Sequence, residues 1–175
     1  IILRSFMKQL ENKTVFITGA SDGIGKAAAY KFAEAGADLI VSSRRENVIK
    51  EIGKDIADKF GVKVKAFKLD VRHMEEVDKA VEGIEEDIDI LINNAGLSRG
   101  LEFFYNDNPA GWEEMIDTNI KGLLYVTRAV VKKMISRNSG HILNLGSIAG
   151  HEAYSKGGVY CATKHAVKAI TESLR

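Results

Sequence analysis

Short apolar runs alternate along the chain with longer segments whose apolar residues recur at helical spacing. The apolar runs are rich in β-branched residues and are typical of strands that are buried on both faces. The expected strands are residues 14–18, 38–43, 62–69, 88–92 and 141–145. The expected helices run from Lys26 to about Gly36, over residues 45–60, 74–86 and 109–137, and onward from about Gly157.

This alternation of strands and helices predicts the fold class. Crossovers long enough to hold a helix join parallel strands, and their right-handed sense places helices on both faces of the sheet. We therefore expect an α/β fold, a Rossmann-like doubly wound parallel sheet. No repeat, low-complexity tract or linker divides residues 1–175, so a single domain is expected. In such sheets a ligand binds beyond the carboxyl ends of the strands, where the strand order reverses.

The composition, with 45% hydrophobic and 28% charged residues, is that of one soluble globular domain. The formal net charge is +1 and no basic stripe is present, which argues against nucleic acid or an acidic membrane as a partner. No apolar run approaches the roughly 20 residues needed to span a bilayer. The single cysteine, Cys161, excludes an internal disulfide and fits a reducing, cytoplasmic setting. No metal site is expected, because ligand spacing is lacking at His73, His141, His151 and His165.

The two ends of the chain carry signals of their own. Residues 1–6 lack the length and order of a signal peptide, and they would be a non-native leader if Met7 is the natural start. Residues 170–175 still have a helical pattern and no stop signal. We therefore expect the chain to stop within a helix.

A glycine-rich turn follows the first expected strand, with the sequence TGASDGIG over residues 18–25. Glycine allows a tight turn and a close approach of phosphate to the backbone, and the next helix offers unpaired N–H groups to a pyrophosphate. An ordinary strand-to-helix turn is the alternative, but the position within a βαβ series favours dinucleotide binding. The expected contact residues are Gly19, Ser21, Asp22, Gly23, Ile24 and Gly25.

The residues after the second strand indicate which dinucleotide is bound. An acid about 20 residues beyond the glycine turn suits the ribose of NAD, whereas an arginine suits the 2′-phosphate of NADP. This chain has Arg44 and Arg45 there, and its first acid, Glu46, is expected inside the helix. NADP is therefore favoured over NAD, and the alternative is that both arginines are merely solvated at a helix start. Asp22 argues the other way, because an acid near a pyrophosphate weakens anion binding.

Tyr160 and Lys164 are four residues apart and are expected to share one helix face. A free phenol has a pKa near 10 and is a poor acid–base group at neutral pH. An ammonium group about 4 Å away favours the phenolate by about 4 kcal/mol at an effective dielectric near 20, which brings a phenol toward neutrality. The pair therefore predicts a proton donor and acceptor, although such a spacing alone is usually an amphipathic surface match.

Further segments follow in a recognisable order. The chain carries Asp70-Val71 after the third strand, Asn94-Ala95-Gly96 after the fourth, Asn119 in the long helix and Ser147 after the fifth strand. With the glycine turn and the Tyr-Lys pair, this series resembles the short-chain dehydrogenase/reductase superfamily from Lys13 onward. The stretches NNAGLSRG, GWEEMIDTNIKGLLYVTRAV and VYCATKHAVKAITESLR are most similar to NADP-dependent 3-hydroxy acid dehydrogenases, including those acting on serine and allo-threonine.

The resemblance implies a catalytic role for four residues. Tyr160 would exchange a proton with the substrate oxygen while hydride moves to or from nicotinamide. Ser147 would hydrogen-bond that oxygen and stabilise its developing charge. Lys164 would hold the nicotinamide ribose, and Asn119 would anchor a water that relays protons between Lys164 and solvent.

The resemblance also implies cofactor contacts beyond the glycine turn. Asp70 would bind the adenine amine and Val71 would flank the ring, while Asn94 would brace the central strands. Ala95 and Gly96 would lie against the cofactor. From the residues alone, Asp70 could equally cap a helix, and the asparagine-glycine run could be a simple turn.

The activity implied is that of an NADP(H)-dependent oxidoreductase interconverting a secondary alcohol and a ketone, with a small 3-hydroxy acid such as serine or allo-threonine as substrate. Residues 1–175 would then be one dinucleotide-binding and catalytic domain. Reduction of a 3-oxoacyl thioester is the alternative reaction, and a catalytically idle NADP-binding redox sensor is an alternative of another class. The resemblance further implies a homodimer or homotetramer, and C-terminal strands and a substrate-covering segment that residues 1–175 lack.

Overall fold

Five parallel strands form the sheet of the computed structural model, which describes residues 9–174. The expected leader at residues 1–6 and the last residue of the expected final helix, Arg175, lie outside the described residues. The sheet order is β3-β2-β1-β4-β5, and every neighbouring pair is parallel. The strands are β1 (Thr14–Thr18), β2 (Asp38–Ser43), β3 (Val64–Lys68), β4 (Ile90–Asn93) and β5 (His141–Asn144).

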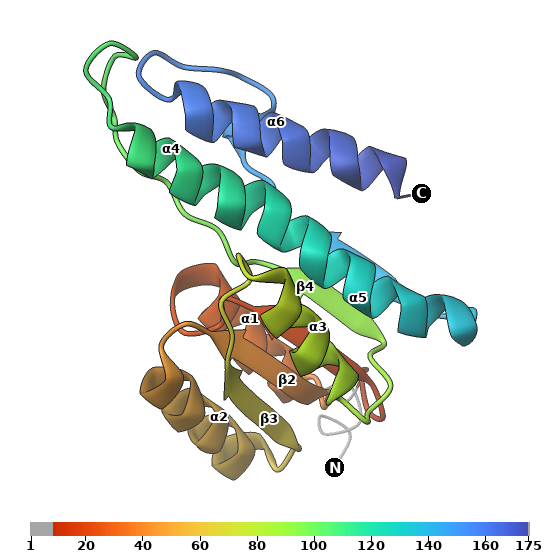
Figure 1. The fold of residues 1–175 in the computed structure, drawn as a ribbon. Coiled ribbons are helices and arrows are strands. Elements are labelled where there is room, and N and C mark those ends of the chain that lie inside the picture. The colour runs from red at the N-terminus through yellow and green to blue at the C-terminus, as the bar shows by residue number, and fades with distance from the viewer. Residues whose placement is uncertain (1–8, 175) are drawn as a thin grey trace.

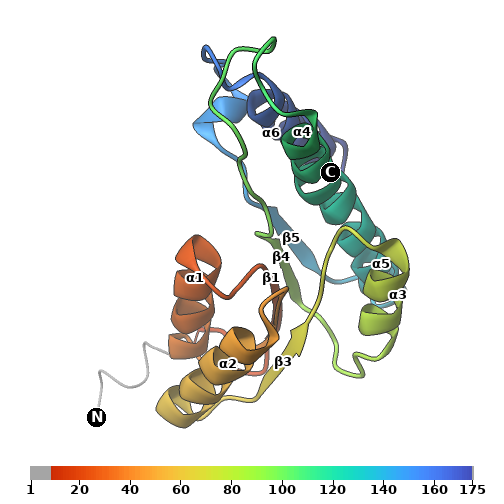
Figure 2. The same ribbon diagram turned by 60° about the vertical axis from the view of Figure 1, so that its left-hand side comes forward.

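Helices cover both faces of this sheet (Figures 1 and 2), which confirms the predicted fold class. Helices α1 and α2 lie on one face, and α3 and α5 lie on the other. The long helical region consists of α4, a π-helical segment η1 and α5 in one continuous rod, and α6 packs beside α4 (Figure 1). The bounds are α1 (Gly23–Glu34), α2 (Glu46–Phe60), α3 (Met74–Glu82), α4 (Pro109–Ile116), η1 (Asp117–Gly122), α5 (Leu123–Ser136), the 3₁₀ turn η2 (Ile148–Gly150) and α6 (Gly158–Ser173).

The central strands supply apolar side chains to two separate cores. Because successive strand residues point to opposite faces, Val15 and Ile17 of β1 pack under α1 and α2, whereas Phe16 packs under α3 and α5. All three side chains are fully buried. This burial on both sides explains why the strands appear in the sequence as near-continuous apolar runs.

Strand order reverses between β1 and β4. From β1 the chain continues to β2 and β3 on one side, and then crosses back to β4 and β5 on the other. The carboxyl ends of β1 and β4 are therefore neighbours, and the loops that leave them diverge to opposite faces. This arrangement places the glycine-rich turn beside Asn94 at the position where a ligand site was expected.

Several element boundaries differ from the sequence prediction for identifiable reasons. Helix α1 begins at Gly23 rather than Lys26, because the Asp22 carboxylate caps it by accepting a hydrogen bond from the Gly23 amide at 2.8 Å. Helix α3 ends at Glu82, four residues early, and Gly83 follows as its C-cap. Strand β3 is shorter than expected, and β4 is shifted to Ile90–Asn93. Within residues 9–174, no helix has the length and apolar character required to cross a membrane.

Leu91 lies on β4 and is fully buried in the core under α3 and α5. We expect Leu91→Ala to lower the free energy of unfolding by about 2–5 kcal/mol, because it leaves a cavity that the rigid sheet cannot close. Urea unfolding measures this loss. The matched control is Ile135→Ala on α5, where the side chain is 70% exposed; its free energy should change by less than about 0.5 kcal/mol. Equal losses for both variants would contradict the assignment of Leu91 to the core.

Candidate functional site

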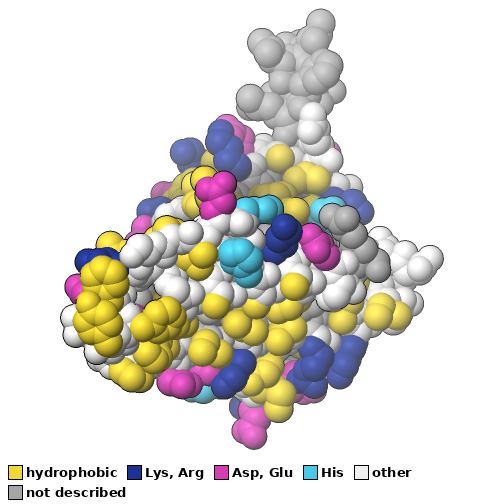
Figure 3. Space-filling view, turned by 90° about the horizontal axis from the view of Figure 1, so that it is seen from above, with side chains coloured by type: hydrophobic (Ala, Val, Ile, Leu, Met, Phe, Trp, Pro, Cys, Tyr) yellow, Lys and Arg dark blue, Asp and Glu magenta, His cyan; other side chains and the backbone are white. Residues whose placement is uncertain are grey.

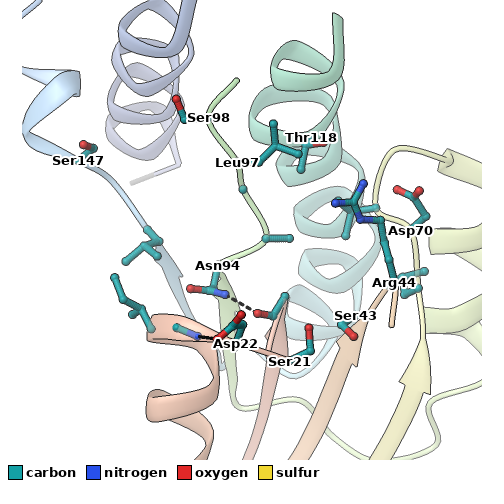
Figure 4. Close-up of a pocket in the computed structure, with 18 of the residues that line it drawn as sticks. Ser21, Asp22, Ser43, Arg44, Asp70, Asn94, Leu97, Ser98, Thr118 and Ser147 are labelled. Carbon is teal, nitrogen blue, oxygen red and sulfur yellow. Dashed lines mark hydrogen bonds between the residues drawn. The ribbon is translucent and has the colours of Figure 1, made fainter. Parts of the chain in front are cut away.

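A pocket of about 700 Å³ lies at the carboxyl ends of the strands (Figure 4). Its walls come from the ends of all five strands and from the start of α6, so residues far apart in sequence meet there. Most of the site residues expected from the sequence line it: Gly19, Ser21, Asp22, Gly23, Ile24, Arg44, Arg45, Asp70, Val71, Asn94, Ala95, Gly96, Ser147, Tyr160 and Lys164. Two expected residues, Gly25 and Asn119, lie behind this lining and support it.

The glycine turn and the end of β4 are in direct contact. The Asn94 side-chain amide donates hydrogen bonds to the carbonyl oxygens of Thr18 and Gly19 at 3.0 and 2.9 Å. The Thr18 hydroxyl in turn accepts from the backbone amides of Asn94 and Ala95. A Cβ on Gly25 would overlap the Asn94 amide, and Gly19 has a φ of +67°. Glycine is therefore required at both positions, for lack of space at one and for backbone conformation at the other.

Asp22 lies at the first turn of α1, where its negative charge was expected to weaken the binding of a pyrophosphate. Besides capping the helix, its carboxylate lies 3.5 Å from the Arg45 guanidinium. Arg45 also donates to the Ser21 hydroxyl from Nε and Nη2, at 3.2 and 2.9 Å. The Gly23 amide and then Arg45 lower the pKa of Asp22. Arg45 thus ties β2 to the glycine turn and offsets the carboxylate beside it.

Arg44 points to the opposite side of the pocket, toward α4. Its Nη1 lies 3.2 Å from the Glu114 carboxylate, which also accepts from Arg99 at 2.6 Å. Arg72 completes this cluster, 3.8 Å from Glu114. The sequence prediction did not include Arg72, Arg99 or Glu114, because they come from three segments whose contacts depend on the folded arrangement.

Asp70 lines the pocket but does not cap α3, whose N-cap is His73. Its carboxylate accepts three side-chain hydrogen bonds from Arg72, the shortest at 2.6 Å, and one from the Arg72 backbone amide. Partial burial raises the pKa of Asp70, but the hydrogen bonds and charge of Arg72 outweigh it, and the net shift is downward. Asp70 is therefore held as a carboxylate in a fixed orientation.

Ser147 is the N-cap of the short turn η2. Its hydroxyl oxygen accepts a hydrogen bond from the Ala149 amide at 3.2 Å. This leaves the O–H proton free to be donated toward the pocket. Residue Gly150 of η2 packs on α6 so closely that a Cβ there would lie 2.7 Å from the Lys164 carbonyl oxygen. The contact sets the distance of Ser147 from the first turns of α6.

Tyr160 and Lys164 lie on one face of α6, with the Lys164 ammonium 5.9 Å from the centre of the phenol ring. Lys164 is 8% exposed, and its Nζ donates to the Leu145 carbonyl oxygen at 2.9 Å. Burial lowers the pKa of Lys164. Because an ammonium group has three N–H donors, two remain for other partners after the bond to Leu145.

Asn119 lies in the π-helical segment η1 and is 2% exposed. Its side chain accepts from the Leu97 amide, and donates to the Leu97 carbonyl and the Thr163 hydroxyl, at 2.9, 2.8 and 3.1 Å. Gly96 lies between Asn119 and Lys164, since a Cβ there would be 3.2 Å from Asn119 Oδ1 and 3.8 Å from Lys164 Nζ. Asn119 therefore joins the segment after β4 to α6, next to the Lys164 ammonium.

Seven further residues line the pocket that the sequence prediction left out: Ser43, Leu69, Leu97, Ser98, Thr118, Leu145 and Gly146. Four of them end a strand or lie within two residues after one, namely Ser43, Leu69, Leu145 and Gly146, so the general rule for parallel sheets could have identified them. Leu97 and Ser98 lie further along the segment that leaves β4. Thr118 could not be found in this way, because it enters the pocket from η1. Cys161, next to Tyr160, is buried and is not among the lining residues. Within residues 9–174, no group of three or more His, Cys, Asp or Glu side chains is arranged to hold a metal ion.

Two loops with exposed aromatic side chains extend from this end of the molecule. Phe103 stacks on Tyr105 at 5.6 Å, and Lys156 from the other loop lies 4.8 Å from the centre of the Phe103 ring. Phe104 and Tyr105 are 65% and 81% exposed. Apolar side chains gather at one edge of the face seen from above (Figure 3). These exposed rings give this end of the molecule a surface that favours apolar contacts.

Comparison with known proteins gives a consistent result. A family model described as short chain dehydrogenase matches residues 13–175. The NADP-dependent 3-hydroxy acid dehydrogenase of Schizosaccharomyces pombe is 43% identical over 173 residues, 97% of this chain and 67% of that protein. The enzyme of the same name from Salmonella typhi is 42% identical over 164 residues, 92% of this chain and 64% of that protein.

One solved structure that is similar to this chain contains a bound cofactor. The closed form of a serine dehydrogenase complexed with NADP⁺ superposes with a TM-score of 0.87 at 39% identity, and the match covers 93% of this chain and 65% of that one. The chain thus spans about two thirds of the length of the relatives that it matches.

The buried Lys164 ammonium predicts a pH-dependent effect on stability. Its pKa in the folded protein is below the ordinary 10.5, so unfolding takes up a proton between these two values. The penalty for burying the charge is therefore complete below the folded pKa and disappears as pH rises toward 10.5. We therefore expect the free energy of unfolding of the unchanged protein to rise relative to that of Lys164→Met as the pH is raised from 7 to 10.

Urea unfolding of both proteins at the two pH values measures this difference. The control is Lys132→Met on the exposed side of α5, whose difference from the unchanged protein should stay constant because water surrounds Lys132 in both states. A difference for Lys164→Met that does not change with pH would contradict the assigned burial.

Proposed function

Since the chain belongs to the short-chain dehydrogenase family, we propose that it is an NADP(H)-dependent oxidoreductase that interconverts a secondary alcohol and a ketone. The observation that carries the proposal is the meeting of Ser147, Tyr160 and Lys164 with the glycine turn in one pocket. A small 3-hydroxy acid such as serine or allo-threonine is the substrate we propose, because relatives 42–43% identical are named for 3-hydroxy acids and a similar solved structure is a serine dehydrogenase.

The residues of the pocket fit a dinucleotide. The turn between β1 and α1 has no side chain at Gly19 and Gly23, and it leads directly into the N-terminus of α1, where a pyrophosphate finds amide donors. The Asp22 carboxylate caps this helix through the Gly23 amide. Asp70 and Val71 would hold the adenine, and Ala95 and Gly96 would lie along the cofactor. Arg44 and Arg45 are the groups available to a 2′-phosphate, which supports NADP(H) over NAD(H).

Hydride transfer is the chemistry that the bound nicotinamide supplies. During oxidation, the substrate C–O–H group loses its proton to the Tyr160 phenolate as hydride leaves the same carbon, so the C–O single bond becomes a carbonyl. During reduction, the Tyr160 phenol returns that proton to the carbonyl oxygen. The free O–H of Ser147 would donate to the same oxygen and stabilise the negative charge that develops there.

Lys164 acts next to Tyr160 in this proposal. Its remaining N–H donors would bind the nicotinamide ribose, and its ammonium group lies 5.9 Å from the centre of the Tyr160 ring. Asn119 would hold a water that connects Lys164 to solvent, and the approach of both side chains to Gly96 supports this. We also propose that the protein works in the cytoplasm. We further propose that it forms a homodimer or homotetramer, and sedimentation analysis of the purified protein tests this oligomeric state.

The decisive experiment is a substrate panel followed by NADPH absorbance. 3-Hydroxy acids with NADP⁺ should give NADPH, and 3-oxo acids should consume it, whereas NAD⁺ should support slower turnover. Faster consumption with 3-oxoacyl thioesters than with free acids would favour the thioester reductase instead. Binding of NADPH with no turnover across a broad carbonyl panel would contradict the enzyme and favour a redox sensor.

Tyr160→Phe tests the assigned proton donor. The variant keeps the ring but loses the hydroxyl, so turnover should fall by about 100-fold or more, the usual share of a general acid. NADPH affinity, measured by fluorescence titration, should stay within about twofold. Near-normal turnover would contradict the role of Tyr160.

Arg44→Ala tests the phosphate contact. Losing a charge-assisted hydrogen bond to the 2′-phosphate should weaken NADPH binding by about tenfold or more, while NADH binding should change little. The two dissociation constants, measured side by side, give the answer. Equal losses for both cofactors would mean that Arg44 does not contact the phosphate.

A further inference from the structure

One carboxylate, that of Glu114, is shared by arginines from three segments at the edge of the pocket. Arg44 follows β2, Arg72 follows β3, and Arg99 follows β4, while Glu114 lies on α4. Arg44 lines the pocket at the carboxyl end of β2 (Figure 4). Glu114 therefore lies within hydrogen-bond distance of an arginine on which the proposed 2′-phosphate site depends.

The contacts of Glu114 are unequal. Arg99 donates from Nε to Oε2 at 2.6 Å, whereas Arg44 donates to Oε1 at 3.2 Å. Arg72 is at 3.8 Å and is mainly engaged with Asp70. Arg99 also donates from Nη2 to Oε1 at 3.4 Å. Glu114 thus accepts two hydrogen bonds from Arg99 and one from Arg44, and it keeps Arg99 as a partner if Arg44 turns to another anion.

We propose that Glu114 competes with the 2′-phosphate of NADP(H) for Arg44, so that it weakens binding of the phosphorylated cofactor and leaves binding of NAD(H) unchanged. This inference rests on the proposed function. A carboxylate and a phosphate dianion next to one guanidinium repel each other, and Glu114 occupies Arg44 before the phosphate arrives. Arg99 moderates the competition, because it neutralises the carboxylate that Arg44 must leave.

Asp22, the acid beside the other arginine proposed for the 2′-phosphate, Arg45, has the weaker effect. Its side chain is 81% exposed and lies 3.5 Å from Arg45, whereas the Glu114 side chain is 21% exposed. Water and salt screen an exposed charge more strongly than a half-buried one. Glu114 is therefore the specificity-determining acid of the two.

The test removes the charge and keeps the geometry. Glu114→Gln retains an oxygen that can accept from Arg44, so the orientation of the arginine is preserved while the repulsion is lost. NADPH should bind about three- to fivefold more tightly to this variant, in the range of a partly exposed charge pair. NADH affinity should not change. Glu113→Gln, which removes the same charge from an exposed neighbour on α4, is the control and should leave both dissociation constants unchanged.

Arg99→Gln should change the affinity for NADPH in the opposite direction. It removes the charge that neutralises Glu114, so NADPH should bind more weakly, and this loss should be smaller when Glu114→Gln is also present. Fluorescence titrations with NADPH and NADH on the four proteins measure this cycle and need no turnover. Salt should reduce the differences for NADPH.

Weaker NADPH binding by Glu114→Gln would overturn the inference and make Glu114 a residue that positions Arg44. Equal effects on NADPH and NADH, or the same loss for Arg99→Gln in both backgrounds, would overturn it as well. If the unchanged protein shows no preference for NADPH over NADH, the proposed function fails on its cofactor and the inference fails with it. A preserved NADPH preference with an unaltered Glu114→Gln variant would overturn the inference alone.

Discussion

The close approach of two backbone segments, at the ends of β1 and β4, is the constraint on which the site depends. A Cβ on Gly19 would lie 2.8 Å from Ala95 Cα, and the Asn94 amide fills the space that a side chain at Gly25 would need. The hydrogen bonds of Asn94 to Thr18 and Gly19 fix this contact. Because α1 starts directly after the turn, its N-terminus is aimed at the pocket by the same contact.

Electrostatics at the pocket edge are balanced rather than strongly positive. Arg45 is matched by Asp22, Arg72 by Asp70, and Arg44 shares Glu114 with Arg99. A site of this kind holds its arginines in defined positions before any anion is present, so less ordering is needed on binding. The same pairing limits affinity, because an arriving anion must share these partners. Rapid exchange of a cofactor benefits from such a limit.

Local sequence signals predicted most of the fold, and also most of the residues that line the pocket. β-Branched runs identified the strands, and the glycine and asparagine residues after β1 and β4 marked the point where strand order reverses. The ion pairs escaped prediction, because Arg44 and Glu114 are 70 residues apart in the sequence and their contact arises only when α4 packs over the sheet edge.

The π-helical segment at residues 117–122 also escaped prediction, because its apolar spacing resembles that of an ordinary helix. Such a segment holds one extra residue within a helix, and each residue of an α-helix turns it by about 100°. The rod can therefore present α4 to α6 while α5 faces the sheet, with Asn119 directed inward between them. Deleting a single residue here would rotate one half of the rod against the other, so either the sheet would lose its cover or α6 its support. The length of this segment is consequently not free to vary, whichever side chain occupies its exposed position at Lys121.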